Sequence, residues 1–115
     1  MKWYIAKIVF HININHGEHH SQFDESVRLI EAESMNDAFH KARSIGKKEE
    51  VEFVNKMNEL VEWKFIDVSD VYQLEELKHG SEVHSSTLVD YRSADYISMV
   101  RHKAQILRDK AIILS

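Results

Sequence analysis

Histidine is the residue type with the widest chemical use in this chain, and its distribution is uneven. Eight histidines occur in 115 residues, and four of them, His11, His16, His19 and His20, fall in or beside one polar segment. Neutral imidazole is the usual protein ligand of zinc, copper and nickel. The spacing lacks the helical His-x-x-x-His register, and no cysteine is present to complete a structural zinc set. A solvated loop without a metal site is therefore favoured, while adventitious metal binding by His16, His19 and His20 stays open.

Carboxylates are the second group that could do chemistry. Asp24 and Glu25 follow the histidine-rich segment, and Asp67 and Asp70 lie in the middle of the chain. A carboxylate pair divides acid and base roles only where a cleft holds substrate and separates the two pKa values. Adjacent residues of a strand point to opposite faces, which argues against a shared site at Asp24 and Glu25. We predict no catalytic residue from these pairs.

Signatures of cofactor binding and nucleophilic chemistry are missing from the sequence. It contains no glycine-rich phosphate loop and no nucleophile elbow, and the lack of cysteine excludes thiolate and disulfide chemistry. Five aromatic residues on predicted strands could line a pocket or stack a base, but strand cores need large side chains, so core packing is favoured. These aromatic residues are Trp3, Tyr4, Trp63, Phe65 and Tyr72. We predict no cofactor, and the sequence leans away from an enzyme.

The charge distribution bears on the partners of the protein. The net charge is −4, which argues against generic nucleic-acid binding, because neutralising phosphates takes a surplus of Lys and Arg. Between Glu49 and Glu76 nine acids accompany two lysines, a balance of −7, whereas between Arg92 and Lys110 five bases accompany two acids, a balance of +3. Opposed blocks can support self-association, although solvated faces are the commoner outcome.

The first third of the chain predicts a hairpin. Every second residue from Tyr4 to Ile14 is apolar, the pattern of a long, half-buried strand. The polar segment 15–22 contains Gly17 and should turn the chain into a second strand near 23–33. The two strands together predict an antiparallel pair with a long loop.

A helix is predicted over 35–45. Ser34 is a candidate N-cap, Asp37 follows three residues later as in a capping box, and Gly46 is expected to end the helix in the left-handed region. For residues 47–55 a further helical turn is favoured over a short strand.

The middle of the chain predicts a turn and then a second hairpin. Residues 56–59 should form the turn, and 61–67 alternate as a strand. The apolar Ile66 and Val68 suit a central position or a bulge. The partner of this strand is expected at 71–77 or 83–89, with a turn at 78–81 around Gly80.

The last segment predicts a helix with a heptad-like apolar seam, capped near Ser93 and covering roughly residues 94–110. The segment contains too few heptads to predict a coiled coil, so docking on the domain's own sheet is favoured, with docking on a partner subunit as the alternative. The predicted interface residues are Ile97, Val100, Ala104, Leu107 and Ala111.

Length and composition predict one folded domain over 1–115. Apolar residues make up 43% and charged residues 30%, close to globular averages. The predicted fold class is α+β, a mainly antiparallel sheet of four to five strands with two principal helices packed on it. No signal peptide and no run of 18 apolar residues is present, so a soluble, cytoplasmic protein without membrane attachment is expected.

Several separated motifs give the chain a family resemblance. In order they are Trp3-Tyr4-Ile5-Ala6-Lys7, Phe23-Asp24-Glu25, Leu29-Ile30-Glu31-Ala32, Asp37-Ala38, Lys41-Ala42, Ile45-Gly46, Trp63-Lys64-Phe65-Ile66-Asp67-Val68 and Gly80-Ser81-Glu82-Val83, with Tyr96-Ile97 and Lys103-Ala104 in the last helix. This pattern resembles the small bacterial family catalogued as domain of unknown function 4288. The resemblance implies a bacterial stand-alone domain with no established activity, and it carries over no functional residues.

Two functions from different classes fit these observations. The first is a non-enzymatic binding or protein-interaction module, expected to be a homodimer and in one version an immunity or antitoxin-like protein whose acidic middle masks a basic partner. The alternative is a small enzyme or metabolite-binding protein with a pocket between sheet and helix. The sequence supplies neither the ligand nor the physiological process.

Overall fold

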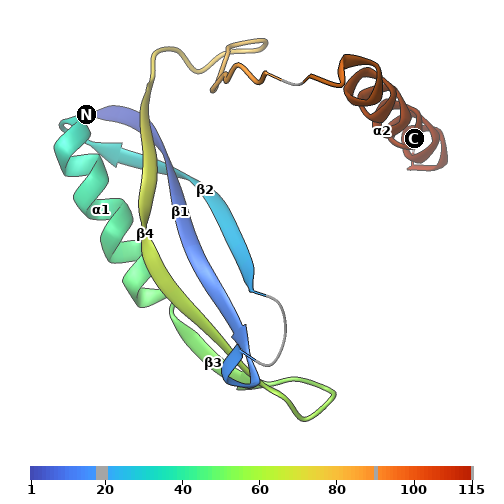
Figure 1. The fold of residues 1–115 in the computed structure, drawn as a ribbon. Helices are drawn as coiled ribbons and strands as arrows, with labels where there is room; N and C mark the ends of the chain where they lie inside the picture. Colours follow the sequence, from blue (N-terminus) through green and yellow to red (C-terminus); the bar gives the residue numbers. More distant parts are fainter. Residues whose placement is uncertain (18–20, 90, 115) are drawn as a thin grey trace. The chain divides into compact units, whose positions relative to one another are not determined.

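The computed structural model describes residues 1–17, 21–89 and 91–114, with side chains through Ala111. It divides into two compact units, residues 1–84 and residues 85–115. The first unit contains four strands and helix α1, and the second contains helix α2 (Figure 1). The predicted α+β fold with an antiparallel sheet and two principal helices is thereby confirmed. That residues 1–115 form one domain remains a prediction.

The sheet of the first unit has the strand order β2-β1-β4-β3, and every neighbouring pair is antiparallel (Figure 1). Its strands are β1 (Lys2–Ile14), β2 (Gln22–Ala32), β3 (Val51–Val54) and β4 (Leu60–Leu74). The predicted pairing of the first two strands is confirmed, with the 3-10 turn η1 (Asn15–Gly17) at the end of β1. The long strands β1 and β4 occupy the centre, and β2 and β3 form the edges.

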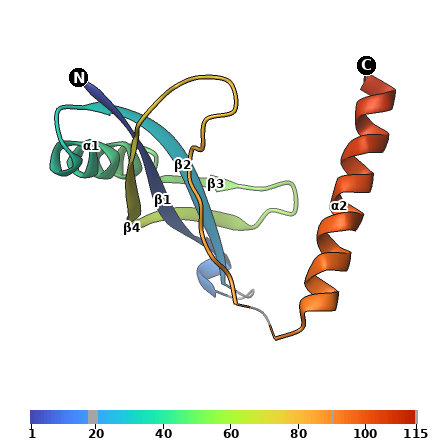
Figure 2. The ribbon, with the colours of Figure 1, turned by 90° about the horizontal axis from the view of Figure 1, so that it is seen from above.

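Helix α1 (Met35–Lys48) covers one face of this sheet and contacts β1, β2 and β4 (Figure 2). Its predicted N-cap is confirmed, because the Asp37 N–H donates to Ser34 Oγ at 3.1 Å. The Glu33 N–H donates to Asp37 Oδ2 at 3.0 Å, and this bond holds the pKa of Asp37 below its ordinary value. The carboxylate therefore satisfies a backbone donor just before the helix begins.

Gly46 does not end α1, so this part of the prediction was wrong. The helix continues through Lys48, and Gly46 is buried within it. A Cβ atom at this position would collide with the Phe65 ring and press on Ile8. The glycine is needed because the helix backbone lies directly on the sheet, and no left-handed turn is involved.

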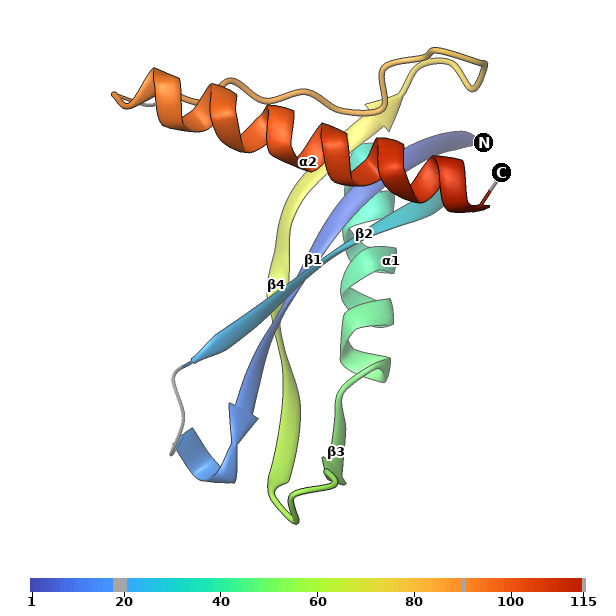
Figure 3. The same ribbon diagram turned by 90° about the vertical axis from the view of Figure 1, so that its right-hand side faces the viewer.

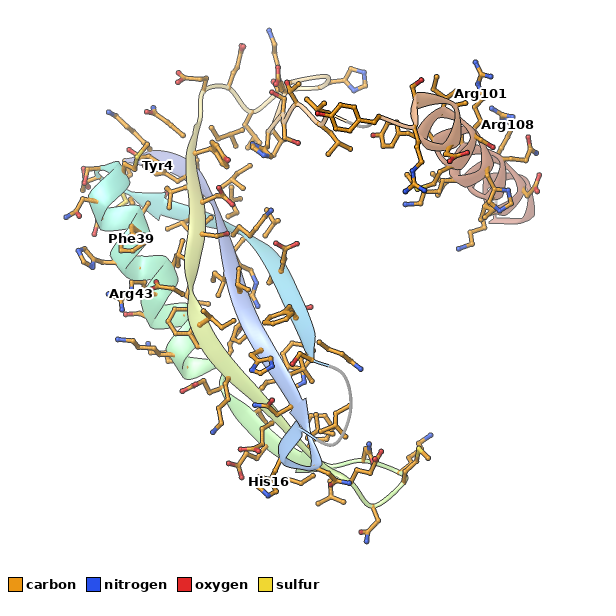
Figure 4. All side chains as sticks on the ribbon, in the orientation of Figure 1. Tyr4, His16, Phe39, Arg43, Arg101 and Arg108 are labelled. Carbon is orange, nitrogen blue, oxygen red and sulfur yellow. The ribbon has the colours of Figure 1, made fainter. Side chains whose placement is uncertain are left out.

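The core lies between α1 and the sheet. The even-numbered residues of β1 point toward the helix, as the alternation predicts, and Tyr4 is 2% and Ile8 0% exposed. The Phe10 ring lies 5.9 Å from the Trp63 ring and 6.2 Å from the Phe65 ring between centroids. Figure 4 labels Tyr4 of β1 and Phe39 of α1, which come from the two layers that enclose this core.

Residues 51–54 form strand β3, which corrects the favoured helix. Asn55 Oδ1 accepts hydrogen bonds from the N–H groups of Met57 and Glu59, both at 2.9 Å, and Asn58 has φ of 62°. This tight turn brings the chain back against β4. Pairing with an available strand edge outweighs the weak helical preference of so short a segment.

The second predicted hairpin is also wrong. Neither 71–77 nor 83–89 turns back on the middle strand, because β4 runs on to Leu74 and pairs with β1 along its length. The register shifts twice, between Lys7 and Ile8 and between Val9 and Phe10, so the expected bulge near Ile66 and Val68 is confirmed. The turn at 78–81 is present, with the Ser81 N–H donating to Lys78 O at 3.1 Å and Gly80 at φ of 84°.

In the second unit, α2 (Ser93–Leu114) is a 22-residue helix (Figure 3). It is longer than the predicted 94–110. The N–H groups of Asp95 and Tyr96 donate to Arg92 O at 3.1 and 3.2 Å and close its first turn. Within residues 1–17, 21–89 and 91–114, no helix combines the length and apolar character needed to cross a membrane.

Candidate interaction surfaces

The sheet face opposite α1 carries exposed apolar side chains, and we call it the open face. Residues directly opposite each other on neighbouring strands point to the same face of a sheet. The odd-numbered residues of β1 point away from α1, so their partners on β2 and β4 also belong to the open face. Trp3 is 39%, Val27 59%, Leu29 53% and Tyr72 37% exposed. Its members are Trp3, Ile5, Lys7, Val9 and His11 of β1, Phe23, Glu25, Val27, Leu29 and Glu31 of β2, and Lys64, Asp70, Tyr72 and Leu74 of β4, of which Ile5 and Leu74 are buried.

The open face also carries an excess of negative charge. Lys7 Nζ lies 3.8 Å from Glu25 Oε1 and 3.9 Å from Asp70 Oδ2. The Tyr72 hydroxyl donates to Asp70 Oδ1 at 3.2 Å, and partial desolvation together with this carboxylate raises the pKa of Tyr72. With Glu31, three acids stand against Lys7 and Lys64, which leaves a balance of −1. The surface is thus apolar with an acidic border.

A groove with a volume of about 490 Å³ runs between α1 and the edge strand β2. Two contacts tie its walls together. Lys41 Nζ donates to Glu31 O at 2.9 Å, and Arg28 Nη1 donates to Glu49 Oε1 at 2.9 Å, a bond that raises the pKa of Arg28. The lining residues are Leu29, Ile30 and Glu31 of β2 and His40, Lys41, Ser44, Ile45 and Lys48 of α1.

The seam of α2 is exposed within its own unit. Ile97 is 47%, Val100 45% and Leu107 66% exposed, and Ala104 and Ala111 lie on the same stripe at 100° per residue. By the same geometry Arg101 and Arg108, both labelled in Figure 4, flank the stripe on one side. Lys103 and Lys110 flank it on the other side, and Asp95 and Asp109 lie on the back of the helix. The seam is an apolar stripe between two rows of cations.

Comparison with known proteins identifies the first unit. A family model described as Domain of unknown function (DUF4288) matches residues 3–85. The chain belongs to this family. No curated protein and no solved structure matches. The DUF4288 region coincides with the first unit and ends before α2, so the match does not extend to the last helix, where the resemblance also included Tyr96-Ile97 and Lys103-Ala104.

The histidines of the DUF4288 region are distributed over separate places. His16 lies in η1 with Nδ1 3.5 Å from Glu62 Oε1 (Figure 4), whereas His11 stacks on Phe23 on the open face at 4.9 Å between centroids. His19 and His20 lie outside the described residues. Across the remainder of the chain, no three His, Asp or Glu side chains gather where they could hold a metal ion. Metal binding by the loop stays an untested hypothesis.

Among the described residues, most of the candidate carboxylates of the DUF4288 region contact groups on other elements of the fold. Glu25 contacts Lys7 on the open face, while Asp67 lies 3.2 Å from Arg43 Nε of α1 (Figure 4). Asp67 and Asp70 thus have different partners. Much of the acidic middle is paired in the same way, since Glu49 binds Arg28 and Glu50 Oε2 accepts from the Phe65 N–H at 2.9 Å. These acids serve as internal contacts.

The prediction of core packing was right for three of the five aromatic residues. Tyr4, Trp63 and Phe65 belong to the core or pack against it, but Trp3 and Tyr72 lie on the open face, where it was wrong. The alternative function included a pocket between sheet and helix, and a groove lies there, but its lining residues were not predicted. Lys41 and Ser44 of α1 share this surface only because the edge of β2 lies beside the helix.

Proposed function

We propose that this protein is a non-enzymatic interaction module that forms a homodimer, in which α2 of each copy covers the open face of the other copy's sheet. The observation that carries the proposal is the match between two exposed apolar surfaces of opposite charge. The seam of α2 is flanked by four cations, and the open face is bordered by Glu25, Glu31 and Asp70. The predicted interface residues, Ile97, Val100, Ala104, Leu107 and Ala111, supply its apolar centre.

Apolar burial supplies the driving force for this arrangement. Removing apolar surface from water stabilises a contact by roughly 25 cal/mol per Å², and exposed side chains such as Leu29 and Leu107 obtain that gain only on a partner surface. A two-fold exchange of helices repeats the contact twice in each dimer. The acidic border of the open face would then meet the cationic flanks of α2, which favours the correct docking over others.

Direct pairing of two α2 helices fits the charges less well. Arg101 and Arg108 on one flank and Lys103 and Lys110 on the other would meet the same four cations of a second helix. Like charges brought together across an interface cost free energy and suppress that arrangement. Docking of α2 on the sheet of its own chain uses the same two surfaces, and molecular mass in solution distinguishes it from exchange between copies.

The test is light scattering at tens of micromolar protein on three matched variants. We expect wild type to have twice the chain mass and Leu107→Asp, in the seam, to have the mass of one chain. Val27→Asp, on the open face, should have the same effect. His102→Asp places the same charge on the back of α2 and should remain dimeric. A monomeric wild type, or Leu107→Asp and His102→Asp with equal masses, contradicts the proposal.

A second candidate function is binding of a small metabolite in the groove between sheet and helix. The observation in its favour is the 490 Å³ groove lined by Lys41, Lys48, His40 and Ser44, which together could hold an anionic group. We expect such a ligand to raise the melting temperature by mass action. A thermal-shift screen with carboxylate and phosphate metabolites tests this, with Lys48→Ala as the control that should abolish the shift.

A further inference from the structure

Strand β2 has a backbone edge that is open to a further strand. It pairs with β1 alone in the described sheet. Glu31 O accepts from Lys41 Nζ and therefore points away from β1, and backbone groups alternate in direction along an antiparallel strand. Val27 and Leu29 thus direct both N–H and C=O outward, and in the described part of the chain these groups have no partner. An edge of this kind can template a further strand.

The groove lies beside this edge and is basic. Lys48 lines it with no ion-pair partner among the described residues. Lys41 lines it two turns earlier on α1, where its Nζ lies 3.4 Å from Asp37 Oδ2 as well as 2.9 Å from Glu31 O, so a ligand carboxylate would share this lysine with Asp37. The one carboxylate of the lining belongs to Glu31, which is cross-strand partner to Trp3 and so points to the open face, away from the helix. Ile30 and Ile45 form an apolar floor between the two lysines.

We propose that this groove binds an acidic peptide segment in extended conformation, which adds to the sheet as a fifth strand along β2. Main-chain hydrogen bonds to Val27 and Leu29 supply the pairing, as in other cases of strand addition. Every second side chain of the added strand points toward α1. The added strand would use the backbone edge of Val27 and Leu29 and two lysines of α1, whereas the dimer contact would use the Val27 and Leu29 side chains on the open face. Lys48→Glu therefore tests the strand addition and Leu107→Asp tests the dimer, so each can fail without the other.

The spacing of α1 defines the sequence that fits. Lys41 and Lys48 are seven residues apart, about 10 Å along the helix, and lie within about 20° of each other around it. Two strand residues four apart are about 13 Å from each other on one face, a span that flexible lysine side chains can meet. The matching motif is an acidic residue, an apolar residue two positions later over Ile30 and Ile45, and a second acidic residue two positions after that.

The experiment measures fluorescence anisotropy with a nine-residue labelled peptide whose centre reads Asp-Thr-Ile-Thr-Asp, against the full chain. We expect saturable binding below about 1 mM peptide. Two further peptides carry N-methyl groups on alternate backbone nitrogens, and the methylated positions of one peptide are the unmethylated positions of the other. The peptide whose methyl groups block the N–H groups that donate to β2 should not bind, while the other peptide should bind within about twofold of the parent peptide. A groove that merely attracted anions would bind both methylated peptides equally, and that result overturns the proposal.

Two charge variants on α1 locate the site. Lys48→Glu removes the groove lysine that has no ion-pair partner in the described part of the chain, and it should weaken binding roughly tenfold at low salt. Lys47→Glu, the same change one residue away and outside the lining, should alter binding by less than about twofold. In amide spectra of the labelled protein, Val27 and Leu29 should gain exchange protection on adding the peptide. No saturation by about 1 mM peptide contradicts the proposal. If protection of the same amides increases with protein concentration in the absence of peptide, the edge pairs with a second copy of the chain. That result would also overturn the proposal.

Discussion

The two faces of the sheet carry similar apolar residues but differ in what covers them. On the helix side Ile8 and Phe10 are 0% and 2% exposed, while on the open face Val27 and Leu29 are 59% and 53% exposed. The alternation along β1 is nearly as apolar on its odd positions as on its even ones near the start of the strand. Apolar patterning therefore predicts which residues can be buried, but it does not predict whether the first unit itself buries them.

The two helices differ in a parallel way. Helix α1 buries Ala38, Ala42 and Gly46, small residues that let its backbone approach the sheet closely. Helix α2 carries large apolar residues such as Ile97 and Leu107, which are exposed. A helix with small residues on its contact face can pack tightly within one folded unit. A stripe of large exposed residues gains by contacting another surface once the helix has formed. The proposed dimer contact of α2 would use this exposed stripe.

The largest expected effect is a contrast between the two faces. Ile8→Ala should lower the free energy of unfolding by about 3 kcal/mol, because it opens a cavity in a fully buried position. Leu29→Ala on the open face should cost less than about 1 kcal/mol. Urea unfolding at a protein concentration low enough to keep the chain monomeric measures both. Equal losses for the two variants would mean that the open face is already buried within the monomer.

The close approach of α1 can be tested at Gly46. Gly46→Ala should destabilise the fold by about 2 kcal/mol, because its Cβ collides with the Phe65 ring, even though alanine is the better helix former. Thermal unfolding measures this loss. The second-site change Phe65→Leu in the Gly46→Ala background should recover part of it, and a stabilised Gly46→Ala protein would show that the helix stands further from the sheet.

The cap of α1 should make a smaller contribution. Ser34→Ala removes the hydrogen bond from the Asp37 N–H and should lower the free energy of unfolding by about 1 kcal/mol. Chemical denaturation gives the number, and Ser34→Asp should restore most of it, since aspartate is also a good cap. Loss of the same size in Ser34→Asp would argue against capping as the cause.

The smallest effect concerns pH. The hydrogen bond from the Glu33 N–H lowers the pKa of Asp37 from its ordinary value of 3.8, so the ionised Asp37 carboxylate stabilises the fold fully at pH values above 3.8. This stabilisation is lost as the pH falls through the lower pKa that Asp37 has in the folded state. Asp37→Asn should therefore be less stable than wild type near neutral pH, with a difference that narrows as the solution is acidified to about pH 3. Thermal unfolding across this range tests it, and a constant difference would contradict the assignment.

The interface residues illustrate how far sequence reasoning reached. The stripe of Ile97, Val100 and Leu107 was predicted from spacing alone, because a helical period is a local property. A pocket between sheet and helix was predicted only as an alternative, and its lining was not predicted. Lys48 of α1 and Leu29 of β2 are far apart in sequence, and only the packing of the helix beside an edge strand brings them together. A pattern within one element is readable from the sequence, whereas a surface shared by two elements is not.

The sequence by itself determined the alternating strand β1, its hairpin with β2, the Ser34 cap and the amphipathic stripe of α2, because each depends on residues close together in the chain. Only the tertiary structure decided that residues 51–54 are a strand, that β4 runs on along β1, and that Gly46 lies inside a helix. In these cases a long-range hydrogen-bonded or packed partner outweighed local preferences that differ by only about 1 kcal/mol per residue. The same long-range packing decided which face of the sheet is covered.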